Sequence, residues 1–187
     1  MIGLVLGAVL NGSCALVAWL RGDIVLRYDS FNVVYAPILF VCVFVQSSAE
    51  ELICRGYLYQ KLMNKYQKPM IAIVGNAVLF AAFHLLNPGV TLLSFMDTVV
   101  CGLLFSLMVY CSDSIWMAMA AHTAWNYLQN IVLGLPNSGR VMPYAIFKLD
   151  TASARNGFAY TTDFGIEGSV MAILVQVGRH CGVFVFD

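Results

Sequence analysis

Long apolar runs dominate this sequence and constrain its fold most. A helix needs about 20 apolar residues to cross the hydrocarbon core of a bilayer. Five such runs lie at about 2–20, 31–49, 70–87, 90–110 and 115–134. A sixth run, 168–186, is interrupted by Arg179 and His180. Hydrophobic residues make up 60% of the 187 residues and charged residues only 11%, which excludes an ordinary soluble domain. We therefore predict an all-α fold, a polytopic membrane helix bundle of about six transmembrane helices.

The polar connections between the runs predict the topology. No repeat, low-complexity tract or domain linker is visible, so residues 1–187 are expected to form a single domain. Cytoplasmic connections tend to be rich in Lys and Arg, and the 50–69 stretch carries four basic residues: Arg55, Lys61, Lys65 and Lys68. This places 50–69 and the amino terminus in the cytoplasm, and the long polar connection 135–167 on the opposite side.

Charge and cysteine content exclude several classes of function. The formal net charge is zero, so no basic surface indicates a nucleic-acid partner. The six cysteines are scattered through apolar segments without Cys-x-x-Cys spacing. We interpret them as small buried side chains rather than disulfides or zinc ligands.

Two adjacent glutamates follow the second apolar run. The helical pattern continues beyond them to about Asn64, which predicts one long helix that begins near Phe31. Glu51 and Arg55 are four residues apart and can pair on one helix face, whereas Glu50 points elsewhere. An ionisable group among apolar helices is costly unless it is paired or hydrated. We interpret Glu51 as structural and Glu50 as free to act.

His84, in the next helix, is expected to lie at the depth of Glu50. With a turn near Gln67, each of the two residues is 17 positions from the turn. Two antiparallel helices then bring them level, whatever the rise per residue. Phe80 lies one turn before His84 on the same face and can form a wall of the site.

His122 and Asn126 lie one turn apart on one face of the fifth helix, about 6 Å along its axis. Several alanines surround them, and small residues allow a neighbouring helix to approach closely. Gly3 and Gly7 in the first run offer the same possibility. Asp97 in the fourth run is expected to form a local hydrogen bond or to line the same cavity.

Three motifs together resemble a known family. The sequence has Glu-Glu-x-x-x-Arg at 50–55, Phe-x-x-x-His at 80–84 and His-x-x-x-Asn at 122–126. Their types and order resemble the CAAX-protease and bacteriocin-processing (CPBP, or Abi) family over roughly residues 31–134. The segment Phe164 to Gly168 is also similar. Cys54 departs from the aromatic residue that often precedes the motif arginine, and the family domain usually has more helices.

The resemblance implies an intramembrane endopeptidase of the prokaryotic cell membrane that acts on a peptide or a prenylated protein. Glu50, assisted by His84, would activate water, while His122 and Asn126 would donate hydrogen bonds to the oxyanion. Glu51, Arg55 and Phe80 would support these groups. No cofactor is expected on this interpretation, and the oligomeric state is left open.

Three alternatives remain open. Glu50, Glu51, His84 and His122 could bind Zn²⁺ with an open position for water, although Asn126 is a poor zinc ligand and His-Glu-x-x-His is absent. A catalytically silent bacteriocin-immunity or binding module could retain the same residues. A proton or cation transporter could use the same Glu and His cluster.

Overall fold

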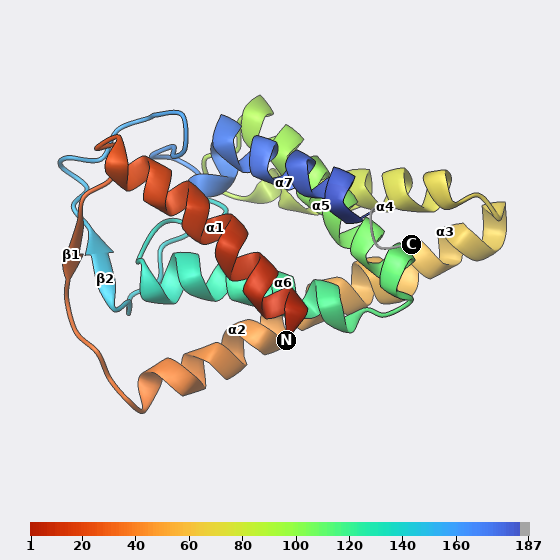
Figure 1. The fold of residues 1–187 in the computed structure, drawn as a ribbon, viewed down its shortest axis with the longest axis horizontal. Helices are drawn as coiled ribbons and strands as arrows, with labels where there is room; N and C mark the ends of the chain where they lie inside the picture. Colours follow the sequence, from red (N-terminus) through yellow and green to blue (C-terminus); the bar gives the residue numbers. More distant parts are fainter. Residues whose placement is uncertain (184–187) are drawn as a thin grey trace.

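The structure, a computed structural model, describes the backbone of residues 1–183 and the side chains of residues 1–178. The chain is mainly helical, as predicted (Figure 1). The α-helices are α1 (Ile2–Leu20), α2 (Tyr35–Glu51), α3 (Tyr59–Tyr66), α4 (Pro69–Phe83), α5 (Leu92–Ser112), α6 (Trp116–Tyr127) and α7 (Val170–Val183). The shorter elements are the π-helical turns η1 (Leu52–Leu58) and η3 (Leu128–Val132), the 3₁₀ turns η2 (His84–Leu86) and η4 (Ile166–Gly168), and the strands β1 (Leu26–Tyr28) and β2 (Phe147–Leu149).

Four helices in the described residues are long and apolar enough to cross a membrane: Ile2–Leu20, Tyr35–Tyr66, Pro69–Leu86 and Leu92–Ser112. They correspond to the first four predicted runs. The predicted span 115–134 is helical over α6 and η3 but shorter than these four. The doubtful run 168–186 forms α7, and its last residues lie outside the described part of the chain.

The second span is one continuous helix of 32 residues, from Tyr35 to Tyr66. It begins at Tyr35 rather than near Phe31 because the Asn32 side chain accepts hydrogen bonds from the backbone N–H groups of Val34 and Tyr35, at 2.9 and 3.0 Å. Such a cap satisfies donors that have no partner within the helix. The helix ends at Gln67, whose backbone is left-handed (φ 52°), and α4 begins at once with Pro69. The turn therefore lies where the sequence predicts it.

Close contacts between helix backbones hold the bundle together. A Cβ atom added at Gly3 or Gly7 of α1 would collide with a backbone carbonyl oxygen of α6, at Met117 or Ala121. These glycines thus seat α1 directly on α6, which carries His122 and Asn126. Likewise, a Cβ atom at Gly102 of α5 would lie 2.9 Å from the Cα atom of Ala77 in α4.

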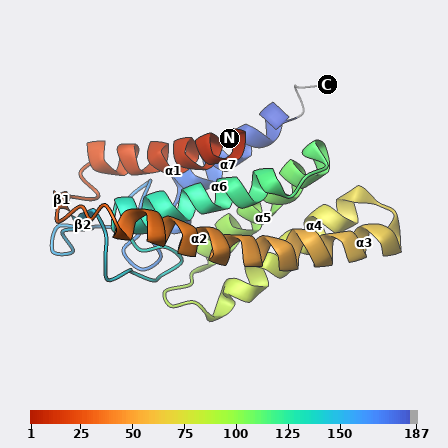
Figure 2. The same ribbon diagram turned by 90° about the horizontal axis from the view of Figure 1, so that it is seen from below.

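The polar connections gather at one end of the bundle. β1 pairs antiparallel with β2, with Leu26 opposite Leu149, a small sheet that the sequence analysis did not predict. Gly89, after η2, lies against the backbone of Asp163. Three connections are therefore neighbours: residues 21–34, 87–91 and 133–165. This follows because the helices that they join alternate in direction. Figure 2 shows α2 and α3 as one rod along the bundle, with α4 beside α3.

Candidate active site

A cavity of about 780 Å³ lies among α2, α4, α5 and α6. All four predicted catalytic residues line it: Glu50, His84, His122 and Asn126. Its volume lies in the range of pockets that hold small organic ligands. Much of the remaining wall is apolar, with side chains that include Leu39, Val43, Ile53, Phe83 and Phe105. The structure therefore brings the three motifs together around one cavity.

Glu50 faces both histidines across this cavity. Its side chain is one-third exposed (33%), and its Oε1 atom accepts a hydrogen bond from Gln46. Its Oε2 atom has no hydrogen-bond partner among the described residues. This oxygen lies 3.9 Å from Nε2 of His84 and 3.9 Å from Nε2 of His122. The distance is too long for a direct hydrogen bond, but a single water molecule can bridge it.

The contacts of His84 fix its tautomer. Its Nδ1 atom lies 2.9 Å from the carbonyl oxygen of Phe80, the residue one turn earlier on the same face. A carbonyl oxygen can only accept, so Nδ1 carries the proton and Nε2 of the neutral ring is an acceptor directed at Glu50. The Phe80 ring, with its centroid 4.6 Å from that of His84, forms the wall that the sequence predicts.

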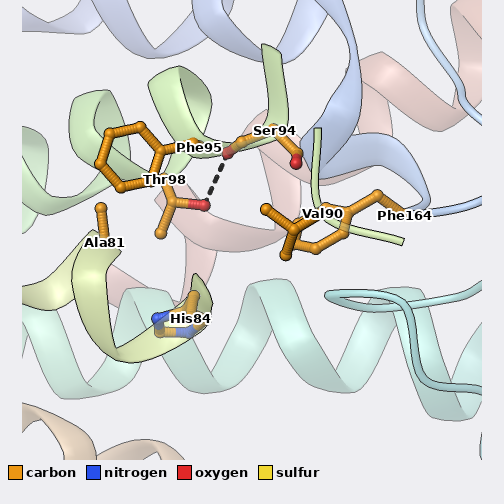
Figure 3. Close-up of a pocket in the computed structure, with 7 residues that line it drawn as sticks. All are labelled: Ala81, His84, Val90, Ser94, Phe95, Thr98 and Phe164. Carbon is orange, nitrogen blue, oxygen red and sulfur yellow. Dashed lines mark hydrogen bonds between the residues drawn. The ribbon is translucent and has the colours of Figure 1, made fainter. Parts of the chain in front are cut away.

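His84 also borders a second, small recess beside α5. Figure 3 shows His84 at its edge and Phe164 at the other end. The Thr98 hydroxyl donates to the Ser94 carbonyl oxygen at 2.8 Å, so it is already engaged. The recess has no room for a water molecule.

Glu51 joins the first motif to the third. Its side chain is fully buried, and its Oε1 atom accepts from Arg55 Nη1 at 3.0 Å and from His122 Nδ1 at 2.9 Å. The sequence predicts the pair with Arg55 but not the bond to His122. Because Nδ1 of His122 donates to Glu51, its Nε2 atom can donate into the cavity only when the ring is protonated. The Phe105 ring stacks on His122 with centroids 5.2 Å apart.

Arg55 is fully buried and is satisfied from several sides. Besides Glu51, it donates to the carbonyl oxygen of Gly102 at 3.1 Å. Its guanidinium lies over the rings of Phe80, 4.3 Å from the centroid, and Phe105, 5.3 Å from the centroid. This arginine thus ties α5 and α4 to the glutamate motif.

Asn126 is buried beside His122 and is hydrogen-bonded at both ends of its carboxamide. Its Nδ2 atom donates to Ser47 Oγ at 3.2 Å, and its Oδ1 atom accepts from Asn137 Nδ2 at 3.0 Å. Neither partner was predicted. Asn137 lies in the long polar connection, where no helical period indicates which side chains face the cavity.

Glu167 is a further carboxylate of the cavity, and it was not predicted as a site residue from the sequence. It belongs to η4 and accepts from Trp125 Nε1 at 3.1 Å, from Asn137 Nδ2 at 2.6 Å and from Ser138 through its backbone N–H at 2.5 Å and its hydroxyl at 3.2 Å. Burial raises the pKa of Glu167 to about 7, although the hydrogen bonds from Ser138 and Trp125 act in the opposite direction. Its segment was predicted only as a weak similarity to the CPBP family.

Asp97 behaves as predicted. It is buried in α5, lines the cavity and accepts a hydrogen bond from Gln176 of α7 at 3.2 Å. This bond connects the last helix to the wall of the cavity.

The predicted zinc alternative fits this geometry poorly. Within the part of the chain that the structure describes, no three His, Cys, Asp or Glu side chains are arranged to hold one metal ion. We therefore derive no step through a metal, and the expectation that no cofactor is needed stays a prediction.

Comparison with known families gives one match. The family model described as Type II CAAX prenyl endopeptidase Rce1-like matches residues 32–128, just over half of the chain. This segment contains Glu50, His84, His122 and Asn126. No curated protein and no solved structure matches the chain.

Proposed function

The chain belongs to the Rce1-like type II CAAX prenyl endopeptidase family, and from this premise we propose that it hydrolyses a peptide bond within the membrane through Glu50, His84, His122 and Asn126. The family resemblance predicted from the three motifs is thereby confirmed. Family membership and the four long apolar helices make it a membrane protein of the endopeptidase type. The catalytic route and the substrate are our proposal.

The observation that carries the proposed mechanism is the free oxygen of Glu50 between two imidazoles. A water molecule held by Glu50 Oε2 and His84 Nε2 has two acceptors for its protons, which makes it a nucleophile. Its oxygen bonds to the scissile carbonyl carbon while one proton passes to Glu50. The C–N bond then breaks, and that proton passes to the leaving nitrogen.

Two donors on α6 suit the negative charge that develops on the carbonyl oxygen. Protonated His122 donates from Nε2, and the Glu51 carboxylate at Nδ1 stabilises that ring charge. Asn126 donates from Nδ2. The loss of one oxyanion donor typically lowers kcat by about 10²–10³. Glu51 therefore acts on the reaction through His122, in addition to its pair with Arg55.

The lining of the cavity supports a CAAX-type substrate. Apolar side chains of α2 and α4 suit a prenyl chain. Arg140 lines the same cavity, and its guanidinium has no ion pair or hydrogen bond among the described residues. Its backbone pairs with that of Asn137, the partner of Asn126. The carboxylate of a C-terminal tetrapeptide lies three residues beyond its cysteine, about 10 Å in an extended chain. We propose that Arg140 binds it.

The decisive experiment uses the full chain purified in detergent. A prenylated peptide ending in Cys-a-a-X, its unprenylated form and a double-glycine leader peptide are incubated with wild type, Glu50→Gln and His84→Ala. We expect cleavage of the prenylated peptide and a loss of about 10²-fold or more in each variant. Asp29→Asn is the matched control, because it makes the same chemical change at an exposed carboxylate paired with Lys148.

Other outcomes identify the alternatives. Activity that survives both substitutions contradicts the mechanism, and activity abolished by a chelator and restored by Zn²⁺ favours the metal route. A folded wild type that binds these peptides without cleaving them favours the silent binding module. Proton or cation flux in proteoliposomes, lost in Glu50→Gln, favours the transporter.

A further inference from the structure

A chain of hydrogen bonds runs from Glu167 through Asn137 to Asn126, and none of the three sequence motifs contains its first two members. Asn137 Nδ2 donates one hydrogen to Glu167 Oε1 at 2.6 Å and the other to Asn126 Oδ1 at 3.0 Å. All three residues line the cavity that contains Glu50. These hydrogen bonds therefore link the long polar segment after α6 to Asn126, the oxyanion donor of the proposed function.

The orientation of the Asn126 amide decides what this residue does. A carboxamide presents a donor at one end and an acceptor at the other, and the two ends have nearly the same shape. With Nδ2 directed at the reaction centre, Asn126 stabilises an oxyanion. A flipped amide directs Oδ1 there instead, and two negatively polarised oxygens then repel each other.

The neighbour on α2 does not fix that orientation. Ser47 is the partner of Nδ2, but a hydroxyl can donate as well as accept, so it tolerates either end of the amide. Asn137 discriminates between the ends only if its own amide cannot flip. Glu167 supplies this constraint, because an ionised carboxylate has acceptors and no donor.

Glu167 is itself held by several donors. Trp125, the residue before Asn126, donates from Nε1, and Ser138 donates from its backbone N–H and its hydroxyl. The backbone of residues 137 and 140 closes a tight turn, and Gly139 N–H donates to Phe164 at 3.2 Å. These contacts fix the Glu167 carboxylate. Glu167 in turn fixes the orientation of the Asn137 amide, and Asn137 fixes that of the Asn126 amide.

We propose that Glu167 and Asn137 are positioning residues that lock the Asn126 amide with its nitrogen directed at the oxyanion. This inference rests on the proposed function, in which Asn126 is an oxyanion donor. It gives residues 133–168 a role in positioning the oxyanion donor, in addition to connecting two helices.

A double-mutant cycle on the full chain tests the proposal, with the prenylated peptide as substrate at pH 8, where Glu167 is ionised. We expect Asn137→Ala to lower kcat by about 10- to 100-fold with KM nearly unchanged, within the limit set by Asn126→Ala. In the Asn126→Ala background, Asn137→Ala should lower kcat no further. A structural role would instead give losses that multiply.

Further substitutions at Asn137 and Glu167 distinguish an effect on the orientation of the Asn126 amide from an effect on stability. Asn137→Asp places an acceptor against Asn126 Oδ1 and should lower kcat more than Asn137→Ala, because it favours the flipped amide. Glu167→Gln keeps one acceptor oxygen and should lose less activity than Glu167→Ala. Thr161→Val is the matched control. It removes the 3.0 Å hydrogen bond from Thr161 to Gly165 in the same polar connection and leaves the hydrogen bonds among Glu167, Asn137 and Asn126 in place. It should lower Tm and leave kcat unchanged.

The outcomes distinguish this inference from the proposed function. If wild type cleaves the peptide and Asn126→Ala is impaired, but the Asn137 and Asn126 losses multiply, the positioning role is wrong while the function stands. A kcat for Thr161→Val as low as that of Asn137→Ala also overturns the positioning role. A wild type that cleaves none of the peptides overturns the proposed function and this inference with it.

Discussion

The two adjacent glutamates should respond in opposite ways to the same chemical change. Glu51→Gln removes the charge from a fully buried pair and leaves the Arg55 guanidinium without its counter-ion. Breaking a buried ion pair on one side typically costs about 3–5 kcal/mol. At about 2–4 °C per kcal/mol for a chain of this length, Tm should fall by roughly 6–20 °C. Activity should fall as well, because protonated His122 loses its carboxylate partner.

Glu50→Gln should leave stability almost unchanged. Glu50 is one-third exposed, its Oε2 atom has no partner among the described residues, and its only described hydrogen bond is to Gln46. Among the described residues, Glu50→Gln breaks no ion pair with an arginine or lysine and leaves no charged partner uncompensated, so little stability should be lost. Cleavage should nevertheless be lost, since an amide cannot take a proton from water.

Thermal unfolding in detergent, followed by tryptophan fluorescence and paired with the peptide-cleavage assay, measures both effects. Arg55→Met in the Glu51→Gln background should recover part of the lost Tm, because it removes the uncompensated charge. A Glu51→Gln variant within about 2 °C of wild type would refute the buried-pair argument. Equal destabilisation by Glu50→Gln and Glu51→Gln would refute the division of roles.

Three further predictions follow from individual contacts. Gly7→Leu should lower Tm strongly and reduce cleavage, because the side chain would push α1 off α6 at Ala121. Gly12→Ala should be tolerated in the same unfolding scan, because its added Cβ atom would lie 3.6 Å from Leu128, an ordinary van der Waals contact. The stability of the wild type relative to Glu167→Gln should fall as the pH rises from 4.5 to about 7, because the pKa of Glu167 in the folded protein lies above its ordinary value of 4.5. A difference in Tm between the two proteins that stays constant over that window would contradict the burial argument. Arg140→Ala should raise KM for peptides with a free C-terminal carboxylate and leave KM for the same peptides with an amidated C-terminus unchanged. Equal effects on both kinds of peptide would show that Arg140 does not bind the carboxylate.

The parts of the site that could be predicted from sequence are those set by helical geometry alone. The pair of Glu51 with Arg55 needs only a spacing of four residues. The approach of Glu50 to His84 needs only equal distances from a turn at Gln67. Both relations hold for any helical hairpin, so no knowledge of the surrounding contacts is required.

The unpredicted partners depend on tertiary contacts instead. Asn137 and Glu167 lie in a connection without a period, and their positions follow from hydrogen bonds between residues 30 apart in the chain. The bond between Glu51 and His122 joins residues 71 apart and depends on the seating of α6 against α2. The β1 and β2 strands have only three residues each, too few for an alternating pattern to indicate them.

The position of one arginine decides which glutamate is free to act. Arg55 follows Glu51 by four residues, so the two share a helix face, and its guanidinium is further held by Gly102 and two aromatic rings. An arginine at position 54 would instead lie four residues after Glu50 and would neutralise the proposed base. Because Cys54 stands there, Glu50 has no arginine partner among the described residues, and its carboxylate faces His84 and His122 across the cavity. The single-residue offset between Glu50 and Glu51 thus separates the role of base from that of support.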